Sequence, residues 1–302
     1  MKSVEGSSPL PNMSLTPTAA GDRDGFLIRQ AACSTRALRK TYFQSAPCTE
    51  TTMHLENKTA LVTGGGTGIG LAITRALVAA GAHVVIVGRD LVRLERVKNE
   101  LGDVSVIQAD LAILTERERL IEALLAQDRP LDLLINNAGV MQYFALADDR
   151  AIGRLDAELA LNLHAPIHLS TALLPHLLAR PEAAIVNVTT GLIYAPFGNT
   201  PGYSAAKAGL HGFTRSLRWQ TRGTNLKVVE LMPPAVETEL TRRYDGPKTD
   251  TASVAGALIK GLANGTEEVR PGQTKALYVM SRIAPGFIFR ALNKAADKAP
   301  LD

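Results

Sequence analysis

Cysteine is scarce in this chain, which holds 2 cysteines among 302 residues. Both of them, Cys33 and Cys48, precede residue 53, so the rest of the chain can build neither a disulfide framework nor a thiolate metal site. No apolar run reaches the roughly 18 residues of a membrane-spanning helix, and we expect no such helix. Residues 53–281 carry equal numbers of basic and acidic side chains. Because nucleic-acid-binding proteins need a concentrated basic face, no nucleic-acid partner is expected.

The first 52 residues show no sustained apolar period, and residues 3–21 are rich in Ser, Thr, Pro and Gly. This composition is typical of a disordered or dispensable extension. Residues 26–40 contain basic side chains and no acid, which resembles a transit peptide, although the acids upstream argue against one. A third interpretation, which we favour, is that Met53 is the natural start. We therefore expect a cytoplasmic protein and leave organelle targeting by residues 1–52 open.

A phosphate-binding loop is predicted in the next segment. Residues 59–63 form a short β-rich apolar run, which is typical of a buried parallel strand. Glycines follow at Gly64, Gly68 and Gly70, and an amphipathic helix is expected over residues 71–80. Glycines let the backbone approach a pyrophosphate, and the free N–H groups and dipole of a helix N-terminus favour its charge. The succession of strand, glycine turn and helix therefore indicates a dinucleotide site.

The end of the second expected strand, residues 83–87, bears on the choice of cofactor. NAD-binding proteins place an acid about 20 residues after the glycines, where it binds the ribose. Here Gly88 directly follows the strand, and Arg89 comes next. A glycine leaves room and a guanidinium suits a 2′-phosphate, so we expect NADP(H) to be preferred over NAD(H). Asp90 is the opposing feature, unless its role is to cap the following helix.

Strands alternate with helices along the middle of the chain. A helix is expected over residues 117–126, and further strands are expected over residues 104–108, 131–135, 184–188 and 227–231. This alternation predicts an α/β fold with a doubly wound parallel sheet. Ligands bind such sheets beyond the carboxyl ends of the strands, where the glycine loop, Asp110 and residues 136–139 would lie.

The catalytic candidates lie in the second half of the chain. Tyr203 and Lys207 are four residues apart in a helical pattern, so their side chains should share one face, although this spacing alone is more typical of a surface helix. A nearby ammonium lowers the pKa of a phenol, which then exchanges a proton near neutral pH. Asn162 lies inside an expected helix over residues 155–178, where Pro166 predicts a kink or break. Beside a backbone carbonyl freed by the proline, this Asn would be placed to hold a water.

Three segments together carry a family resemblance. They are Thr63-Gly64-x-x-x-Gly68-x-Gly70, Asn136-Asn137-Ala138-Gly139 and Tyr203-x-x-x-Lys207, in this order and spacing. Over residues 55–238 the chain resembles the short-chain dehydrogenases/reductases. The resemblance implies a single doubly wound Rossmann-type parallel sheet of about seven strands with helices on both faces. It also implies an oxidoreductase that transfers a hydride between NAD(P)(H) and a carbonyl or alcohol, without a metal.

The resemblance implies a role for each matching residue. Tyr203 is the general acid or base, Lys207 lowers its pKa and binds the cofactor ribose, and Thr190 holds the substrate oxygen. Asn162 anchors a water that relays protons. The expected cofactor-binding residues are Thr63, Gly64, Thr67, Gly68, Ile69, Gly70, Arg89, Asp110, Leu111, Asn137, Ala138, Gly139, Tyr203, Lys207, Pro233, Val236 and Thr238.

Two positions depart from the family pattern. Thr190 stands where most members have Ser, and its extra methyl crowds the site although the hydroxyl is kept. Pro234 replaces a glycine after the sixth strand. These departures leave a second hypothesis, a catalytically weak dinucleotide-binding interaction or sensor protein on the same fold. The presence of Tyr203, Lys207 and Asn162 together favours the enzyme.

A finer resemblance concerns one branch of the family. Residues 187–192, 233–236 and 282–287 are similar to those of uncharacterised, DltE-like oxidoreductases, a branch that brings no known substrate. The partner that the family implies is a small carbonyl or alcohol. Because the helices holding Asn162 and Tyr203 form dimer contacts in many relatives, the resemblance also implies a homodimer or homotetramer.

The end of the chain completes the domain plan. Residues 239–265 are expected to form a substrate lid, within a catalytic domain that spans residues 53–281. Residues 282–302 form a tail in which apolar residues predict a short helix with one apolar side. We expect this helix to dock on its own domain or on a partner subunit, and a membrane-surface or substrate-gate segment is the alternative.

Overall fold

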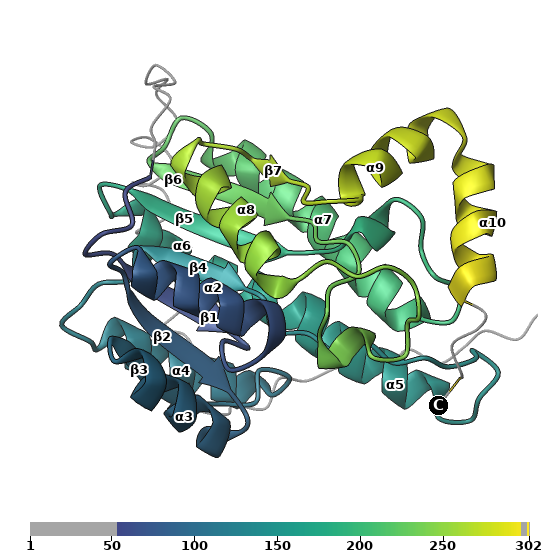
Figure 1. Ribbon diagram of the computed structural model, residues 1–302. Helices are drawn as coiled ribbons and strands as arrows, with labels where there is room; N and C mark the ends of the chain where they lie inside the picture. The colour runs from purple at the N-terminus through teal and green to yellow at the C-terminus, as the bar shows by residue number, and fades with distance from the viewer. Residues whose placement is uncertain (1–52, 297–300, 302) are drawn as a thin grey trace, which may run out of the picture. The chain divides into compact units, whose positions relative to one another are not determined.

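A parallel sheet of 7 strands, in the order β3-β2-β1-β4-β5-β6-β7, forms the centre of the computed structural model, which describes residues 53–296 and 301 (Figure 1). The strands are β1 (Thr59–Thr63), β2 (His83–Gly88), β3 (Val104–Gln108), β4 (Leu133–Asn136), β5 (Ala183–Val188), β6 (Leu226–Leu231) and β7 (Glu268–Val269). In β1, Thr63 pairs with Val87 of β2 on one side, and Val62 pairs with Ile135 of β4 on the other. The strand order therefore reverses direction at β1, which makes the gap between β1 and β4 the topological switch point.

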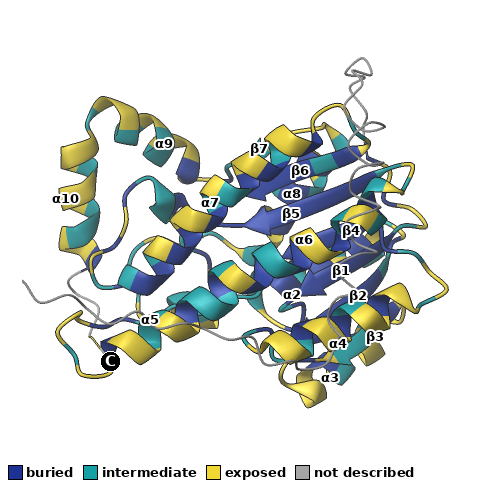
Figure 2. Cartoon of the chain, turned by 180° about the vertical axis from the view of Figure 1, so that it is seen from behind, coloured by how far each residue is buried: buried dark blue, intermediate teal, exposed yellow. Residues whose placement is uncertain are grey.

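Helices cover both faces of this sheet. One face is covered by α2 (Gly68–Ala79), α3 (Leu91–Leu101) and α8 (Thr251–Ala263), and the other by α4 (Leu114–Leu125), α6 (Ala165–Leu178) and α7 (Pro201–Thr221). Figure 2 shows buried strands between helices whose outer sides are exposed. The strands are continuous apolar runs because both of their faces are buried. The predicted doubly wound α/β fold is confirmed.

The described residues belong to one compact unit, Ala46–Asp302. The predictions for residues 1–52 fall outside the described part of the chain. Among the residues that are described, no helix is both long and apolar enough to cross a lipid bilayer.

The expected helix over residues 155–178 is not one regular helix. α5 (Ala151–Leu159) runs into a π-helical turn (Ala160–His164), after which α6 begins. In a continuous α-helix the amide at position 166 would bond the carbonyl of Asn162, and Pro166 has no amide hydrogen to donate. The irregular turn therefore falls at Asn162, upstream of the proline itself.

The chain after β6 also differs from the expected uniform lid. Within residues 239–265, a short 3-10 turn (Glu239–Thr241) borders the cavity described below, whereas α8 packs its apolar side into the core against α2. Beyond β7, α9 (Thr274–Ile283) and α10 (Pro285–Ala296) project from the body as an arm (Figure 1). We call α9 and α10 the C-terminal arm. The expected tail boundary at residue 282 falls inside α9.

The glycine loop offers a test of how tightly it is packed. A Cβ at Gly70 would overlap the Gly64 carbonyl oxygen and lie 2.5 Å from Asn137 Nδ2. We expect Gly70→Ala to lower the free energy of unfolding by about 1–3 kcal/mol, because backbone must move to make room. Gly256→Ala in α8, where nothing lies within 4 Å, should raise it by about 0.5–1 kcal/mol. Urea denaturation measures both changes, and an unchanged stability of Gly70→Ala would contradict the packing.

Candidate active site

The loops that follow β1 and β4 are fastened to each other. The Thr63 hydroxyl accepts hydrogen bonds from the amides of Asn137 and Ala138, both at 2.9 Å. In return, Asn137 Nδ2 donates to the Thr63 carbonyl at 2.9 Å. Gly64 lies so close that a Cβ there would be 3.1 Å from Ala138 Cα. These contacts fix the glycine loop and the Asn-Ala-Gly segment side by side at the switch point.

The glycine loop fits the pyrophosphate of a dinucleotide. Gly64 and Gly68 have φ values of +66° and +51°, a region that favours glycine, and they turn the chain into α2. The N-cap residue Thr67 makes no side-chain capping bond, so the first amides of α2 remain available to an anion. Thr238 stands across from the loop, since a Cβ at Gly68 would lie 3.0 Å from its methyl carbon. Side chains in place of these glycines would therefore fill the space that the loop leaves for a pyrophosphate.

A pair of arginines lies at the end of β2. The side chain of Arg89 is 69% exposed, and its nearest acid is Asp110, whose Oδ2 lies 3.9 Å from Arg89 Nη1. Asp90 caps α3, because its Oδ1 accepts the Arg93 amide at 3.0 Å. Both guanidinium groups line the same cavity. Sequence reasoning missed Arg93, although its position in the first turn of the helix, four residues after Arg89, was a usable signal.

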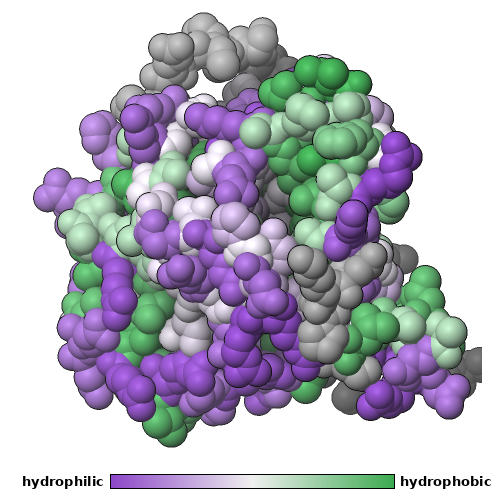
Figure 3. Space-filling model, turned by 45° about the vertical axis from the view of Figure 1, so that its right-hand side comes forward, coloured by the Kyte–Doolittle hydropathy of each residue, from purple (hydrophilic) through white to green (hydrophobic). Residues whose placement is uncertain are grey.

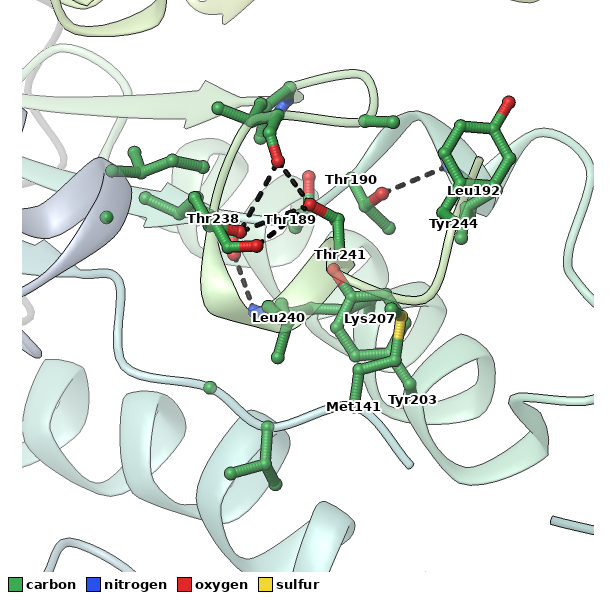
Figure 4. A pocket seen from close by; sticks show the side chains of 18 of the residues that line it. Met141, Thr189, Thr190, Leu192, Tyr203, Lys207, Thr238, Leu240, Thr241 and Tyr244 are labelled. Atoms are coloured by element: carbon green, nitrogen blue, oxygen red, sulfur yellow. Dashed lines mark hydrogen bonds between the residues drawn. The ribbon is translucent and has the colours of Figure 1, made fainter. Parts of the chain in front are cut away.

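Tyr203 and Lys207 lie on one face of α7, where both are buried and both line the cavity (Figure 4). Lys207 Nζ lies 5.9 Å from the centre of the Tyr203 ring and donates to the Val188 carbonyl at 2.7 Å. Burial lowers the pKa of Lys207 to about 8. Burial also raises the pKa of Tyr203 to about 12, against the lowering effect of a hydrogen bond with Thr190. In the free protein burial has the larger effect, and the net shift of the phenol pKa is upward.

Thr190 brings its hydroxyl to the same place. It follows β5 in an extended conformation, and its Oγ1 accepts the Leu192 amide at 3.3 Å. Thr190 also lowers the pKa of Tyr203, against the larger effect of burial. The neighbouring Thr189 donates instead to Oε1 of buried Glu230, at 2.7 Å. Of the two threonines, Thr190 is therefore the one whose hydroxyl belongs with the phenol.

Asn162 lies behind the cavity wall, not on it. Its Oδ1 accepts the Val140 amide at 2.9 Å, and its Nδ2 donates to the Val140 carbonyl at 2.8 Å. A Cβ at Gly139 would lie 2.9 Å from Asn162 Oδ1 and 3.7 Å from Lys207 Nζ, so this glycine separates the two side chains. Val140 occupies one donor and one acceptor position of this side chain, which leaves one of each for an ordered water.

Most of the predicted residues line one cavity of about 1060 Å³. Those on its wall are Gly64, Thr67, Gly68, Ile69, Arg89, Asp110, Asn137, Ala138, Gly139, Thr190, Tyr203, Lys207, Pro233, Val236 and Thr238. Four lie outside the wall: Thr63, Gly70, Leu111 and Asn162. Leu111 is a core residue, and its carbonyl accepts a hydrogen bond from Arg117 Nη1 at 2.7 Å. Cofactor residues and catalytic candidates therefore meet in a single space.

Glu158 is a site residue that sequence reasoning missed. It is fully buried, and its Oε1 accepts the Gln142 amide at 2.8 Å. A Cβ at Gly202 would overlap Glu158 Oε2, so the carboxyl packs directly on the first turn of α7 beside Tyr203. Burial raises the pKa of Glu158 to about 7, although hydrogen bonds from the backbone of Gln142 and Tyr203 oppose this shift. A single Glu in an amphipathic helix gave no signal of this position.

Known proteins share this architecture and these motifs. The family model for the short chain dehydrogenase matches residues 58–248. The uncharacterized oxidoreductase DltE of Bacillus subtilis (strain 168) is 35% identical over 250 residues, which cover 80% of this chain and 98% of the relative. A short chain dehydrogenase from Burkholderia cenocepacia J2315, solved in complex with NADP, shares the fold with a TM-score of 0.71 at 24% identity, over 80% of this chain and 99% of that one.

A further solved structure is 3-ketoacyl-(acyl-carrier-protein) reductase from Brucella melitensis, complexed with NADH. It has a TM-score of 0.67 at 26% identity, over 73% of this chain and 99% of that chain. The family match covers more than half of the chain and includes the glycine loop, the Asn-Ala-Gly segment, Tyr203 and Lys207. This chain belongs to the short chain dehydrogenase family of oxidoreductases and resembles its DltE-like members.

Proposed function

We propose that this protein transfers a hydride between a nicotinamide cofactor and a carbonyl or alcohol, with Tyr203 as the general acid or base. The observation that carries the proposal is the convergence of Tyr203, Lys207 and Thr190 on the cavity that also holds the glycine loop. All three side chains are buried, so their contacts with a bound substrate would be made away from bulk water.

Each side chain has a task in this reaction. The cofactor, when bound, supplies or accepts the hydride. Thr190 and Tyr203, which both line the cavity, hold the substrate oxygen between them. In reduction Tyr203 gives its proton to the developing alkoxide, and in oxidation it takes a proton from the alcohol. Lys207, fixed by the Val188 carbonyl, places its ammonium where it stabilises the phenolate that remains.

The second candidate is a dinucleotide-binding sensor with little catalysis, and one observation favours it. Burial holds the pKa of Tyr203 at about 12 in the free protein, which makes the phenol a weak proton donor. Against it stands the presence of Tyr203, Lys207 and Asn162 together, a combination that a pure binding module would not require. Turnover with a panel of small carbonyls separates the two candidates.

We also propose a homodimer or homotetramer built through α5 and α7. These helices pack side by side and expose large apolar side chains, Ile152 at 74% and Trp219 at 68%. Covering such side chains in a symmetric contact would remove apolar surface from water.

The role of Tyr203 is tested by removing its hydroxyl. Tyr203→Phe should lower kcat by at least about 100-fold, because proton transfer is lost, while the dissociation constant for the cofactor stays within about threefold of wild type. Thr190→Ser should keep or raise activity, whereas Thr190→Val should lower kcat by about 100-fold or more. Absorbance of the reduced nicotinamide follows turnover. A fully active Tyr203→Phe variant would refute the mechanism.

The preference for NADP(H) is tested at Arg89. A charge-assisted bond from its guanidinium to the 2′-phosphate, at about 1.5–3 kcal/mol, corresponds to roughly tenfold or more in affinity. Calorimetric titration should therefore show tighter binding of NADPH than of NADH, and Arg89→Ala should weaken the binding of NADPH far more than that of NADH. Arg96→Ala, an exposed arginine of α3 away from the cavity, is the matched control and should change neither affinity. Equal binding of both cofactors by the wild type would contradict the preference.

Glu158 is proposed to position the first turn of α7, and its ionisation gives a pH-dependent readout. Its folded pKa of about 7 exceeds the ordinary 4.5, so the unfolded chain loses this proton first as pH rises. The stability that Glu158 contributes is full below pH 4.5 and is lost as pH rises to about 7. The melting temperature of Glu158→Gln, measured relative to that of the wild type, should therefore increase as the pH rises from 4.5 to about 7. A constant difference would contradict the shift, and Asp156→Asn, an exposed carboxylate on α5, is the control.

A further inference from the structure

The C-terminal arm forms one side of the cavity. Leu277 and Met280 of α9 and Ile288 and Leu292 of α10 line the space that Tyr203 also lines. All four arm side chains are half-buried. Other apolar side chains of the arm face outward, among them Phe287 at 61% exposure. In Figure 3 hydrophobic surface gathers in the upper part of the face that bears the arm.

Hydrogen bonds fasten the end of the arm to the catalytic loop. Asn293 Oδ1 accepts the Gly198 amide at 2.6 Å, and Asn293 Nδ2 donates to the Pro196 carbonyl at 3.0 Å. Asn199 Nδ2 donates to the Ala296 carbonyl at 2.9 Å. The loop that receives these bonds runs from Thr190 to the start of α7. The arm is therefore held on the catalytic side of the cavity, away from the glycine loop.

Apolar side chains also stand on the other walls on this side, together with polar ones such as Gln142, Arg243 and Gln273. The apolar side chains are supplied by Met141 after β4, by Leu192 and Phe197 of the catalytic loop, and by Leu240 after β6. The cationic Arg242 nearby is paired with Glu239, at 2.8 Å. A ligand that extends from the hydroxyl groups of Tyr203 and Thr190 toward the arm therefore meets the apolar side chains of Leu277, Met280, Ile288 and Leu292. Sites that orient a mainly apolar molecule by a few polar contacts have this arrangement.

From this arrangement we infer that the substrate is a carbonyl compound, or its alcohol, that carries an apolar chain of several carbons. Its oxygen binds at Tyr203 and Thr190, and its chain lies against Met280, Ile288 and Leu292 of the arm. The inference rests on the proposed function for the chemistry at the oxygen. The placement of the substrate's apolar chain rests on the arm alone. This placement makes Met280, Ile288 and Leu292 determinants of specificity.

Binding of a ketone series tests the inference without turnover. The full chain is saturated with whichever of NADP⁺ or NAD⁺ binds more tightly, so no hydride is available to a ketone. Straight-chain methyl ketones from butanone to decan-2-one are then titrated by calorimetry. The dissociation constant should fall by about threefold to fourfold for each methylene until the compartment is full, as expected for burial of a methylene. A dissociation constant that stays flat or rises along the series overturns the inference.

Variants of α10 locate the chain within the cavity. Ile288→Asp and Leu292→Asp place a carboxylate in the apolar wall and should weaken decan-2-one by at least about tenfold while leaving butanone unchanged. Phe287→Asp, on the outer side of the same helix, is the matched control and should change neither ketone. Leu292→Trp keeps the wall apolar but narrows it, so the tightest-binding ketone should become a shorter one. Equal losses of affinity for decan-2-one in Phe287→Asp and Leu292→Asp would overturn the assignment of Leu292 to the wall that holds the apolar chain of the ketone.

Turnover with the reduced cofactor separates this inference from the proposed function. Chain-length-dependent binding with reduction of the best ketone supports both. Chain-length-dependent binding without any turnover supports the inference on the ligand and contradicts the oxidoreductase mechanism. Turnover of short or charged carbonyls, with no gain from a longer chain, supports the mechanism and overturns the inference.

Discussion

The buried ammonium of Lys207 is the constraint on which the rest of the site depends. A buried charge is costly unless it is hydrogen-bonded, and Lys207 meets this requirement through the Val188 carbonyl at 2.7 Å. That bond ties the first turns of α7 to the end of β5, which places Tyr203 beside Thr190. The same burial lowers the pKa of Lys207 to about 8 and raises the pKa of Tyr203 to about 12. Both shifts disfavour the charged form of the group in the free protein.

The rest of the fold brings two different surfaces to this pair. On one side, the reversal of strand order at β1 opens the gap in which Thr63 and Asn137 fasten the glycine loop to the segment after β4. On the other side, the C-terminal arm supplies apolar wall and is held by Asn293. The side proposed to hold the cofactor is therefore built at the switch point of the sheet, and the side proposed to hold the substrate is bordered by the last helices that the structure describes.

The sequence predicted those elements whose signals are local. The strands Thr59–Thr63 and Val104–Gln108 lie where their short apolar runs placed them. Thr59–Thr63 is fully buried, and fully buried parallel strands need such runs. The glycine loop was predictable since its backbone geometry requires glycine. The irregular turn at Asn162 was only partly predictable, because the proline indicates a break while the contact with Val140 depends on tertiary structure. Glu158, the raised pKa of Tyr203 and the role of Leu292 all depend on what the folded chain places around them, and no local pattern carries that information.

The central claim is that Tyr203 is a proton donor kept inactive by burial and activated when the site is filled. The most direct test is the ultraviolet titration of its phenol, measured as the difference between wild type and Tyr203→Phe, with and without oxidised cofactor. The account predicts no ionisation of Tyr203 near neutral pH in the free protein, and ionisation shifted toward neutral pH once cofactor brings its positive charge close to the phenol. A phenol whose titration is the same in both states would contradict the account.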